Sequence, residues 1–231
     1  MSLSEYYEGS LYPLQDGVLN VVRDSGAPFY LTDGTALSRG YYKHRYSDEL
    51  DFFVNHDGDF PEHVNLVLAK LKENGFVWDA DSGMVKSETF TSVHVRRTGT
   101  DALLKIDFVN DVVPHYGSFI QADFFPRLDN VRNILSNKIG AVFRFSGKDI
   151  ADIREIALHE SFAWADVISE ARNKDGGVEA TVVGEILRTV PLSAFEEIRW
   201  SGPAPDWDSF IDDVGKIAHD LVSCGENSLH P

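Results

Sequence analysis

Cysteine is nearly absent from the sequence, and a leader or membrane segment is not apparent. The single cysteine, Cys224, cannot form a disulfide within the chain, which is typical of proteins in a reducing compartment. A secretory signal begins with a basic group and an apolar run, and the first ten residues contain neither. No stretch approaches the roughly 20 apolar residues that a membrane helix needs. We therefore expect a cytoplasmic protein with no membrane partner.

Basic residues are also scarce. The chain has 21 lysines and arginines against 37 aspartates and glutamates, for a formal net charge of −16. This balance opposes broad binding to nucleic acid, because phosphates are bound through Lys and Arg. A nucleic-acid substrate would need a local basic patch. The two candidate patches, each equally explained as scattered solvated charges, contain Lys43, His44 and Arg45, and His94, Arg96 and Arg97.

What the sequence does have is enough apolar material for a sizeable core. Its 231 residues are 43% hydrophobic and 25% charged, which is ordinary for a globular protein of one large or two small domains. Apolar periodicity and turn residues predict helices, then short antiparallel strands, then helices to the end. Strands are expected near residues 29–31, 49–54, 76–78, 84–85, 90–95 and 102–109, and an irregular segment over 114–126. Helices are expected over 14–25, 35–40, 61–73, 128–140, 148–156, 163–173, 178–190, 192–200 and 208–222.

The strand predicted near residue 50 carries two acids on one face. Successive side chains in a strand point to opposite sides, so Glu49 and Asp51 project together while Leu50 and Phe52 face the core. Two adjacent carboxylates repel unless a cation lies between them, and Mg²⁺ prefers such oxygen ligands. The alternative is a solvated strand end, which composition alone makes common in an acidic protein.

The turn before this strand has the chemistry of a phosphate site. Gly34, Thr35 and Ser38 lie at a junction between a strand and a helix, where free N–H groups and hydroxyls can hold phosphate oxygens. A phosphate cradle and an acid pair on one short segment together suggest a nucleoside triphosphate bound through its metal.

A third acid, Asp107, lies in the apolar strand over residues 102–109. There Ile106 and Phe108 share one face, and Lys105 and Asp107 share the other. An unpaired charge in such a strand would be costly if buried. Asp107 is therefore either a solvent-facing residue on an edge strand or the third member of a carboxylate site.

The order of these motifs resembles the DNA polymerase β-type nucleotidyltransferase superfamily, and within it the AbiEii/AbiGii toxin-like family. The resemblance rests on G-T-A-L-S, then R-x-S, then acid-Leu-Asp-Phe, and covers roughly residues 29–157. The chain departs from the usual pattern at three positions: Asp33 replaces the first glycine of a pair, Glu49 an aspartate, and Lys148 an arginine.

The resemblance implies an α+β fold, a nucleotidyltransferase-type mixed sheet flanked by helices and followed by a C-terminal helical part. The pattern of strands and helices divides the chain near residue 127, into a nucleotidyltransferase-like α/β domain over 1–127 and a helical domain over 128–231. The activity implied is transfer of a nucleoside monophosphate from a nucleoside triphosphate to an acceptor hydroxyl. The acceptor could be an RNA such as a transfer RNA, the protein the toxin of a toxin–antitoxin pair, and its partner a cognate antitoxin.

The resemblance also assigns roles to residues. Glu49, Asp51 and Asp107 would hold two Mg²⁺ ions, and Lys138 would offset the charge of the leaving pyrophosphate, although alone it reads as a surface lysine. Asp149 is explained nearly as well as an acid that interacts favourably with the dipole at a helix N-terminus. The residues implied in nucleotide binding are Gly34, Thr35, Ser38, Arg45, Ser47, Asp149 and Asp152.

The same residues are compatible with two other functions. The chain could be a catalytically degenerate nucleotidyltransferase fold that acts as a nucleotide-binding or regulatory module, which Asp33 and the acidic surface would suit. It could also be a metal-dependent phosphodiester hydrolase that uses the same acids with water as nucleophile.

Overall fold

The computed structural model describes residues 2–79 and 83–230, which divide into two compact units. Unit 1 comprises the chain up to residue 41 together with 46–112 and 118–129, and unit 2 comprises 42–45, 113–117 and the chain from residue 130. The predicted domain boundary after residue 127 stays a prediction. The last boundary between the two compact units lies between residues 129 and 130, and the earlier segments 42–45 and 113–117 also belong to unit 2.

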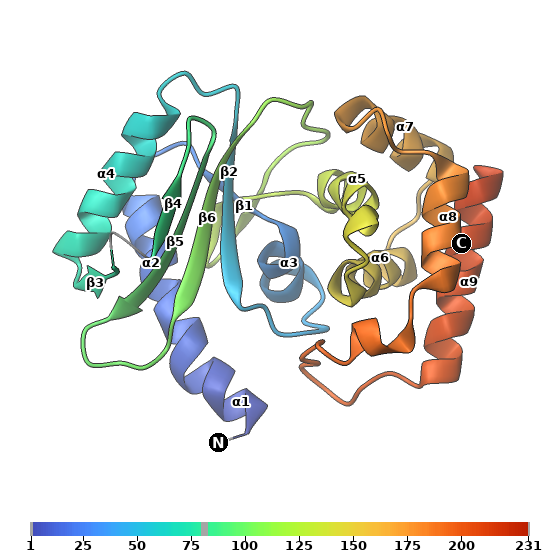
Figure 1. The fold of residues 1–231 in the computed structure, drawn as a ribbon, viewed down its shortest axis with the longest axis horizontal. Helices are drawn as coiled ribbons and strands as arrows, with labels where there is room; N and C mark the ends of the chain where they lie inside the picture. Colours follow the sequence, from blue (N-terminus) through green and yellow to red (C-terminus); the bar gives the residue numbers. More distant parts are fainter. Residues whose placement is uncertain (1, 80–82, 231) are drawn as a thin grey trace. The chain divides into compact units, whose positions relative to one another are not determined.

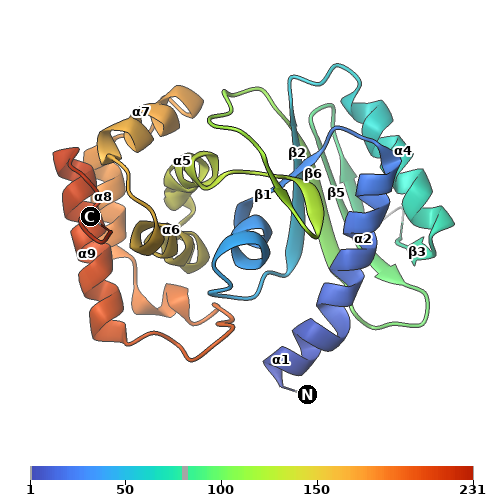
Figure 2. The ribbon, with the colours of Figure 1, turned by 180° about the vertical axis from the view of Figure 1, so that it is seen from behind.

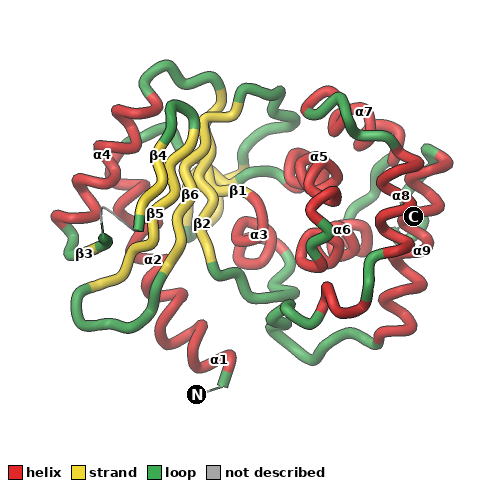
Figure 3. The backbone as a smooth tube through the Cα atoms, viewed as in Figure 1, coloured by secondary structure: helices red, strands yellow, loops and turns green. Residues whose placement is uncertain are grey.

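Unit 1 is built on a mixed sheet, drawn as arrows in Figure 1 and in yellow in Figure 3. Its order is β3-β5-β6-β2-β1-β8-β7, and β4 pairs with β5 beside this path. The pairs β2–β6 and β1–β8 are parallel and the others antiparallel. The strands are β1 (Tyr30–Thr32), β2 (Glu49–Asn55), β3 (Phe76–Val77), β4 (Met84–Lys86), β5 (Phe90–Arg97), β6 (Leu104–Asp111), β7 (Ile120–Ala122) and β8 (Phe125–Leu128).

Helices lie on both sides of this sheet. In Figures 1 and 2, α2 and α4 lie on one side and α3 on the other. The predicted helix over 14–25 is confirmed as α2, which ends where Gly26 takes a φ of 74°, a left-handed value that glycine adopts without strain. The helices and helical turns are α1 (Leu3–Tyr6), η1 (Tyr7–Leu11), α2 (Tyr12–Ser25), α3 (Asp33–Thr35), η2 (Ala36–Tyr41) and α4 (Phe60–Glu73).

The apolar face of the sheet forms the core of unit 1. In β2 the alternating residues Leu50, Phe52 and Val54 are buried, as the sequence predicts. The Phe29 ring lies between sheet and helix, with its centroid 5.0 Å from Phe108 and 6.2 Å from Phe60 of α4. Because this face is filled, the polar residues of β2 must project from the other face.

Residues 114–126 are not wholly irregular, so that prediction was wrong. They contain β7 and the first two residues of β8, and β8 extends the sheet by pairing in parallel with β1 through Leu31 and Leu128. The strands are only three and four residues long, and Pro126 lies within β8, so neither shows a periodic pattern.

Unit 2 is helical, as predicted for the C-terminal part of the chain. The predicted helix over 192–200 is shorter than expected and forms one 3₁₀ turn, η4, after which Trp200 makes a β-bridge with Arg45. The helices and turns are α5 (Val131–Ala141), η3 (Val142–Arg144), α6 (Gly147–His159), α7 (Trp164–Lys174), α8 (Ala180–Thr189), η4 (Leu192–Phe195) and α9 (Trp207–Ser223). Within the described ranges, the helices are too short or too polar to cross a membrane.

Gly147, the first residue of α6, marks a close backbone contact in unit 2. A Cβ at this position would lie 2.1 Å from the main-chain oxygen of Ala194. We expect Gly147→Ala to lower the free energy of unfolding by about 2 kcal/mol, because main-chain atoms must shift. Urea unfolding would measure this. Gly140→Ala in α5 is the matched control, since a Cβ there meets nothing within 4 Å. Equal stability of the two variants would contradict the contact.

Candidate functional site

The register of four strands places polar residues in two adjacent rows on the sheet of unit 1. Asp51 of β2 pairs with Asp107 of β6 and with Thr32 of β1, and Asp107 pairs with Ser92 of β5. Two residues along, Glu49 pairs with Lys105. Because the two rows lie two residues apart on β2 and on β6, they share one face of the sheet.

Three carboxylates meet in these rows. Glu49, Asp51 and Asp107 each offer a carboxylate oxygen, and the three oxygens lie within 4.8 Å of one another. All three side chains are half-buried. The structure therefore brings together the three acids that the sequence reasoning selected, and the parallel pairing of β2 with β6 is the reason.

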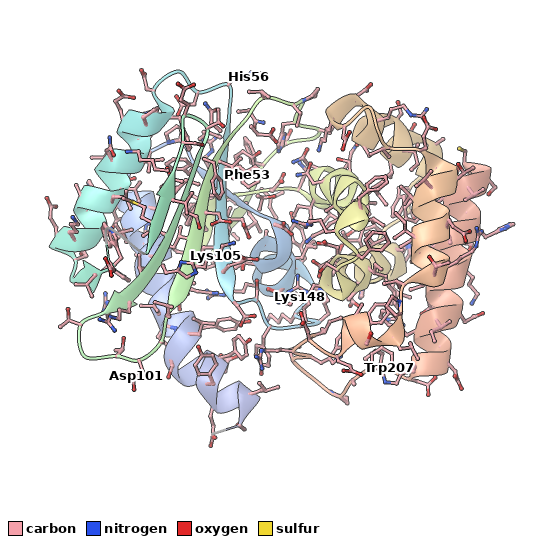
Figure 4. The ribbon with its side chains drawn as sticks, viewed as in Figure 1. Phe53, His56, Asp101, Lys105, Lys148 and Trp207 are labelled. Carbon is pink, nitrogen blue, oxygen red and sulfur yellow. The ribbon has the colours of Figure 1, made fainter. Side chains whose placement is uncertain are left out.

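Lys105 lies among these acids and was not selected as a site residue. Its ammonium donates hydrogen bonds to Glu49 Oε2 and Asp107 Oδ2, each at 2.8 Å. Partial burial lowers the pKa of Lys105, but the hydrogen bonds and charges of Asp107 and Glu49 outweigh it and raise that pKa above its ordinary value. Figure 4 labels this side chain beside β6. The placement of Lys105 and Asp107 on one strand face was the sequence signal for it.

Ser92 also contacts the acids. Its hydroxyl donates to Asp107 Oδ1 at 2.6 Å, so both carboxylate oxygens of Asp107 accept a hydrogen bond within unit 1. Ser92 orients the carboxylate, since it fixes one oxygen while Lys105 holds the other. Nothing in the local sequence of β5 indicates this partner.

The donor set fits a hard divalent cation. It consists of carboxylate oxygens, which Mg²⁺ and Mn²⁺ prefer. The ammonium of Lys105 already lies between two of the carboxylates, so a positive charge is stabilised at this position. Glu49, Asp51 and Asp107 are the residues that could hold a metal.

The turn predicted to bind phosphate is held close to the acid strand. The Thr35 hydroxyl donates to the main-chain oxygen of Glu49 at 2.5 Å and lies 2.7 Å from Ser47 Oγ. The Ser38 hydroxyl donates to the main-chain oxygen of Thr35 at 3.4 Å. Thr35, Ser38 and Ser47 are all buried, and their hydroxyls are used within unit 1. They position the turn against β2, and their contact with phosphate stays a prediction.

Asp33 occupies a backbone conformation that glycine favours. Its φ is 57°, in the left-handed region, where Asp and Asn are the side-chain-bearing residues best tolerated. A glycine would adopt this φ without strain. Gly34 follows and is buried as the second residue of α3.

The other predicted site residues form a buried ionic cluster in unit 2. Arg45 clamps Asp152 with two bonds of 2.7 Å, one from Nε and one from a terminal nitrogen. The Lys138 ammonium lies 2.8 Å from Asp149 and 3.0 Å from Asp152. His44 Nε2, which sequence reasoning did not place in the site, lies 2.8 Å from Asp152 Oδ1.

Asp152 is the centre of this cluster and is fully buried. Burial alone would raise its pKa, but the charges of Arg45 and Lys138 and the hydrogen bonds from His44 and Arg45 hold its pKa well below the usual range. Lys138 is only 4% exposed, so it is not the surface lysine that the sequence alone suggested.

Comparison with sequence families gives no assignment. No family model matches the chain, and no curated protein matches it.

Comparison of the fold with solved structures gives clear matches. JHP933 from Helicobacter pylori aligns with a TM-score of 0.66 at 17% identity, over 96% of this chain and 94% of that chain. A second H. pylori protein, provisionally named a nucleotidyltransferase, aligns with a TM-score of 0.64 at 16% identity, over 96% of each chain.

The third match is MenT4, the nucleotidyltransferase toxin Rv2826c from Mycobacterium tuberculosis H37Rv. It aligns with a TM-score of 0.56 at 14% identity, over 96% of this chain and 90% of that chain. Identities this low establish the fold and not the activity. The predicted fold class is thereby confirmed: the chain has an α+β fold with a mixed sheet flanked by helices, shared with nucleotidyltransferases.

Proposed function

We propose that the chain is a metal-dependent nucleotidyltransferase, which transfers a nucleoside monophosphate from a nucleoside triphosphate to an acceptor hydroxyl. The observation that carries the proposal is the cluster of Glu49, Asp51 and Asp107, with carboxylate oxygens within 4.8 Å of one another on paired strands. Its fold, shared with a protein named a nucleotidyltransferase toxin, is the second support.

In this proposal the three acids hold Mg²⁺. When bound, Mg²⁺ supplies charge neutralisation at the phosphates and lowers the pKa of a coordinated hydroxyl. Asp107 is oriented by Ser92 and accepts the proton of the acceptor hydroxyl. The acceptor oxygen then bonds to the α-phosphorus as the bond to the β-phosphate oxygen breaks, and pyrophosphate leaves.

The turn over Gly34, Thr35 and Ser38 is the proposed phosphate-binding segment. Its supports are the main-chain N–H groups at the start of α3 and the hydrogen bond that ties Thr35 to Glu49. Within unit 2, Arg45 contacts Asp152 and Lys138 contacts Asp149. Their proposed roles towards nucleotide and pyrophosphate come from the sequence resemblance alone.

An RNA acceptor, a toxin role and a cognate antitoxin also belong to this proposal. Each is implied by the resemblance to AbiEii/AbiGii toxin-like proteins, and the fold match to a protein named as a toxin supports the same direction. The net charge of −16 means that RNA contacts would have to come from local basic groups.

The first test is transfer of label from each α-labelled nucleoside triphosphate to bulk RNA in the presence of Mg²⁺. We expect Asp51→Asn to reduce transfer at least about a hundredfold, because residues around metal ligands already cost 10–100-fold when replaced and a ligand should cost no less. Chelation of the metal should abolish transfer in the wild type.

Asp101→Asn is the matched control, since it makes the same change of charge at an exposed position of unit 1. Both variants should retain the circular dichroism of the wild type. Full transfer by Asp51→Asn would contradict the metal assignment, and release of free labelled nucleotide without labelled RNA would indicate a hydrolase instead.

The buried cluster of unit 2 generates a separate prediction about stability. Asp152→Asn leaves the charges of Arg45 and Lys138 buried without their carboxylate, so we expect the free energy of unfolding to fall by about 3 kcal/mol at pH 7. Asp152 has a lowered pKa in the folded state, so its stabilisation is present above the pKa of an unfolded aspartate and is lost as pH falls below it.

Urea unfolding of both proteins between pH 7 and pH 3 would measure this difference. The gap between wild type and Asp152→Asn should be widest at pH 7 and should narrow below about pH 4. A gap that is absent at pH 7, or that widens on acidification, would show that the cluster does not stabilise unit 2.

A further inference from the structure

Lys105 occupies the carboxylate oxygens to which a metal would bind. Its Nζ contacts Glu49 Oε2 and Asp107 Oδ2, which are two of the oxygens that a metal would need. A divalent cation bound through these oxygens would lie beside an ammonium group. Like charges so close repel strongly outside bulk water.

Lys105 is suited to leave the acids without disturbing the fold. Its side chain is 38% exposed and has a flexible four-carbon stem, while its strand neighbours Leu104 and Ile106 are fully buried. The ammonium can therefore turn towards solvent or towards a bound anion while β6 stays in place.

We propose that Lys105 is a resident counter-cation of the acid cluster that weakens metal binding in the nucleotide-free protein. It neutralises part of the charge on Glu49 and Asp107 and must give way before a metal takes these oxygens. The phosphates of an arriving nucleotide would offer the displaced ammonium a new partner, so metal binding would be favoured when nucleotide is present. This inference rests on the metal site of the proposed function.

If the role of Lys105 were purely structural, its replacement would change metal affinity in the opposite direction. If the ammonium only held the two carboxylates in a geometry suited to metal, its removal would leave repelling acids in disorder and metal would bind more weakly. If it is a competitor, its removal leaves Glu49 and Asp107 without the ammonium that they contact, and metal binds more tightly. The sign of the change in metal affinity therefore separates the two roles.

The experiment is a titration of the full chain with Mn²⁺ in the absence of nucleotide. The concentration of free Mn²⁺ is measured at each point by electron paramagnetic resonance. We expect Lys105→Met, which keeps the length of the side chain and removes its charge, to bind Mn²⁺ at least about tenfold more tightly than the wild type. A tenfold gain in affinity is the size of effect expected when one charge-assisted hydrogen-bonding competitor is removed from the carboxylates. Lys105→Arg keeps the charge and should bind Mn²⁺ as the wild type does.

Lys86→Met is the matched control for net charge. Lys86 lies in β4 of the same unit and contacts Asn65, so its removal changes the total charge equally without touching the acids. Unchanged or weaker Mn²⁺ binding by Lys105→Met overturns the proposal while leaving the metal site intact. An equal gain in Lys86→Met also overturns it. Absence of Mn²⁺ binding in both wild type and Lys105→Met would overturn this inference and the proposed metal site together.

Thermal unfolding with and without Mn²⁺ is a second measurement of binding, which can be used even if Lys105→Met is less stable than the wild type. The competing role predicts that Mn²⁺ raises the melting temperature of Lys105→Met by more than that of the wild type, because a ligand stabilises in proportion to its affinity. A smaller rise in Lys105→Met than in the wild type would overturn the proposal.

Discussion

The parallel pairing of β2 with β6 is the constraint on which the candidate site depends. It places Asp51 beside Asp107 and Glu49 beside Lys105 on one face of the sheet. Three carboxylates at this separation repel one another, so the strands would resist this pairing if no cation were present. The Lys105 ammonium supplies that charge within the chain, and the buried aromatic side chains on the other face hold the register.

The two faces of β2 therefore differ in function: one is packed in the core and the other carries the polar residues. Leu50, Phe52 and Val54 are buried on one face and fix the strand, because a slip of one residue would turn them towards the polar side. The opposite face is then free to carry groups that would be costly in a core. The turn at Gly34 joins this arrangement through the bond from Thr35 to the Glu49 main chain. A proposed phosphate segment and a proposed metal site are thus anchored to the same strand.

Sequence reasoning succeeded where the pattern is local. Alternation along residues 49–54 and 102–109 placed Glu49, Asp51 and Asp107 on polar strand faces, and helical periodicity placed the main helices. It could not give the strand order, because parallel pairing between β2 and β6 joins segments that are separated by α4 and three other strands. Lys105 was seen on the face of Asp107, but its contact with Glu49 follows only from that register.

Long-range contacts also explain what was missed in unit 2. Arg45 and Asp152 are 107 residues apart, and no local pattern connects them. Lys138 reads as a surface residue from its helix alone and is buried because Asp149 and Asp152 compensate its charge. The short strands β7 and β8 were missed for a different reason, since segments of three and four residues are too short to show a periodic pattern, and β8 also contains a proline.

The proposed activity requires that the three acids on β2 and β6 form a metal site. The most direct measurement is anomalous diffraction from crystals of the protein grown with Mn²⁺ and a non-hydrolysable nucleoside triphosphate. We expect an anomalous peak bound by Glu49, Asp51 and Asp107, with the Lys105 ammonium moved away from Glu49 and Asp107. A peak bound by other residues, or nucleotide bound with no peak at these three carboxylates, would contradict it.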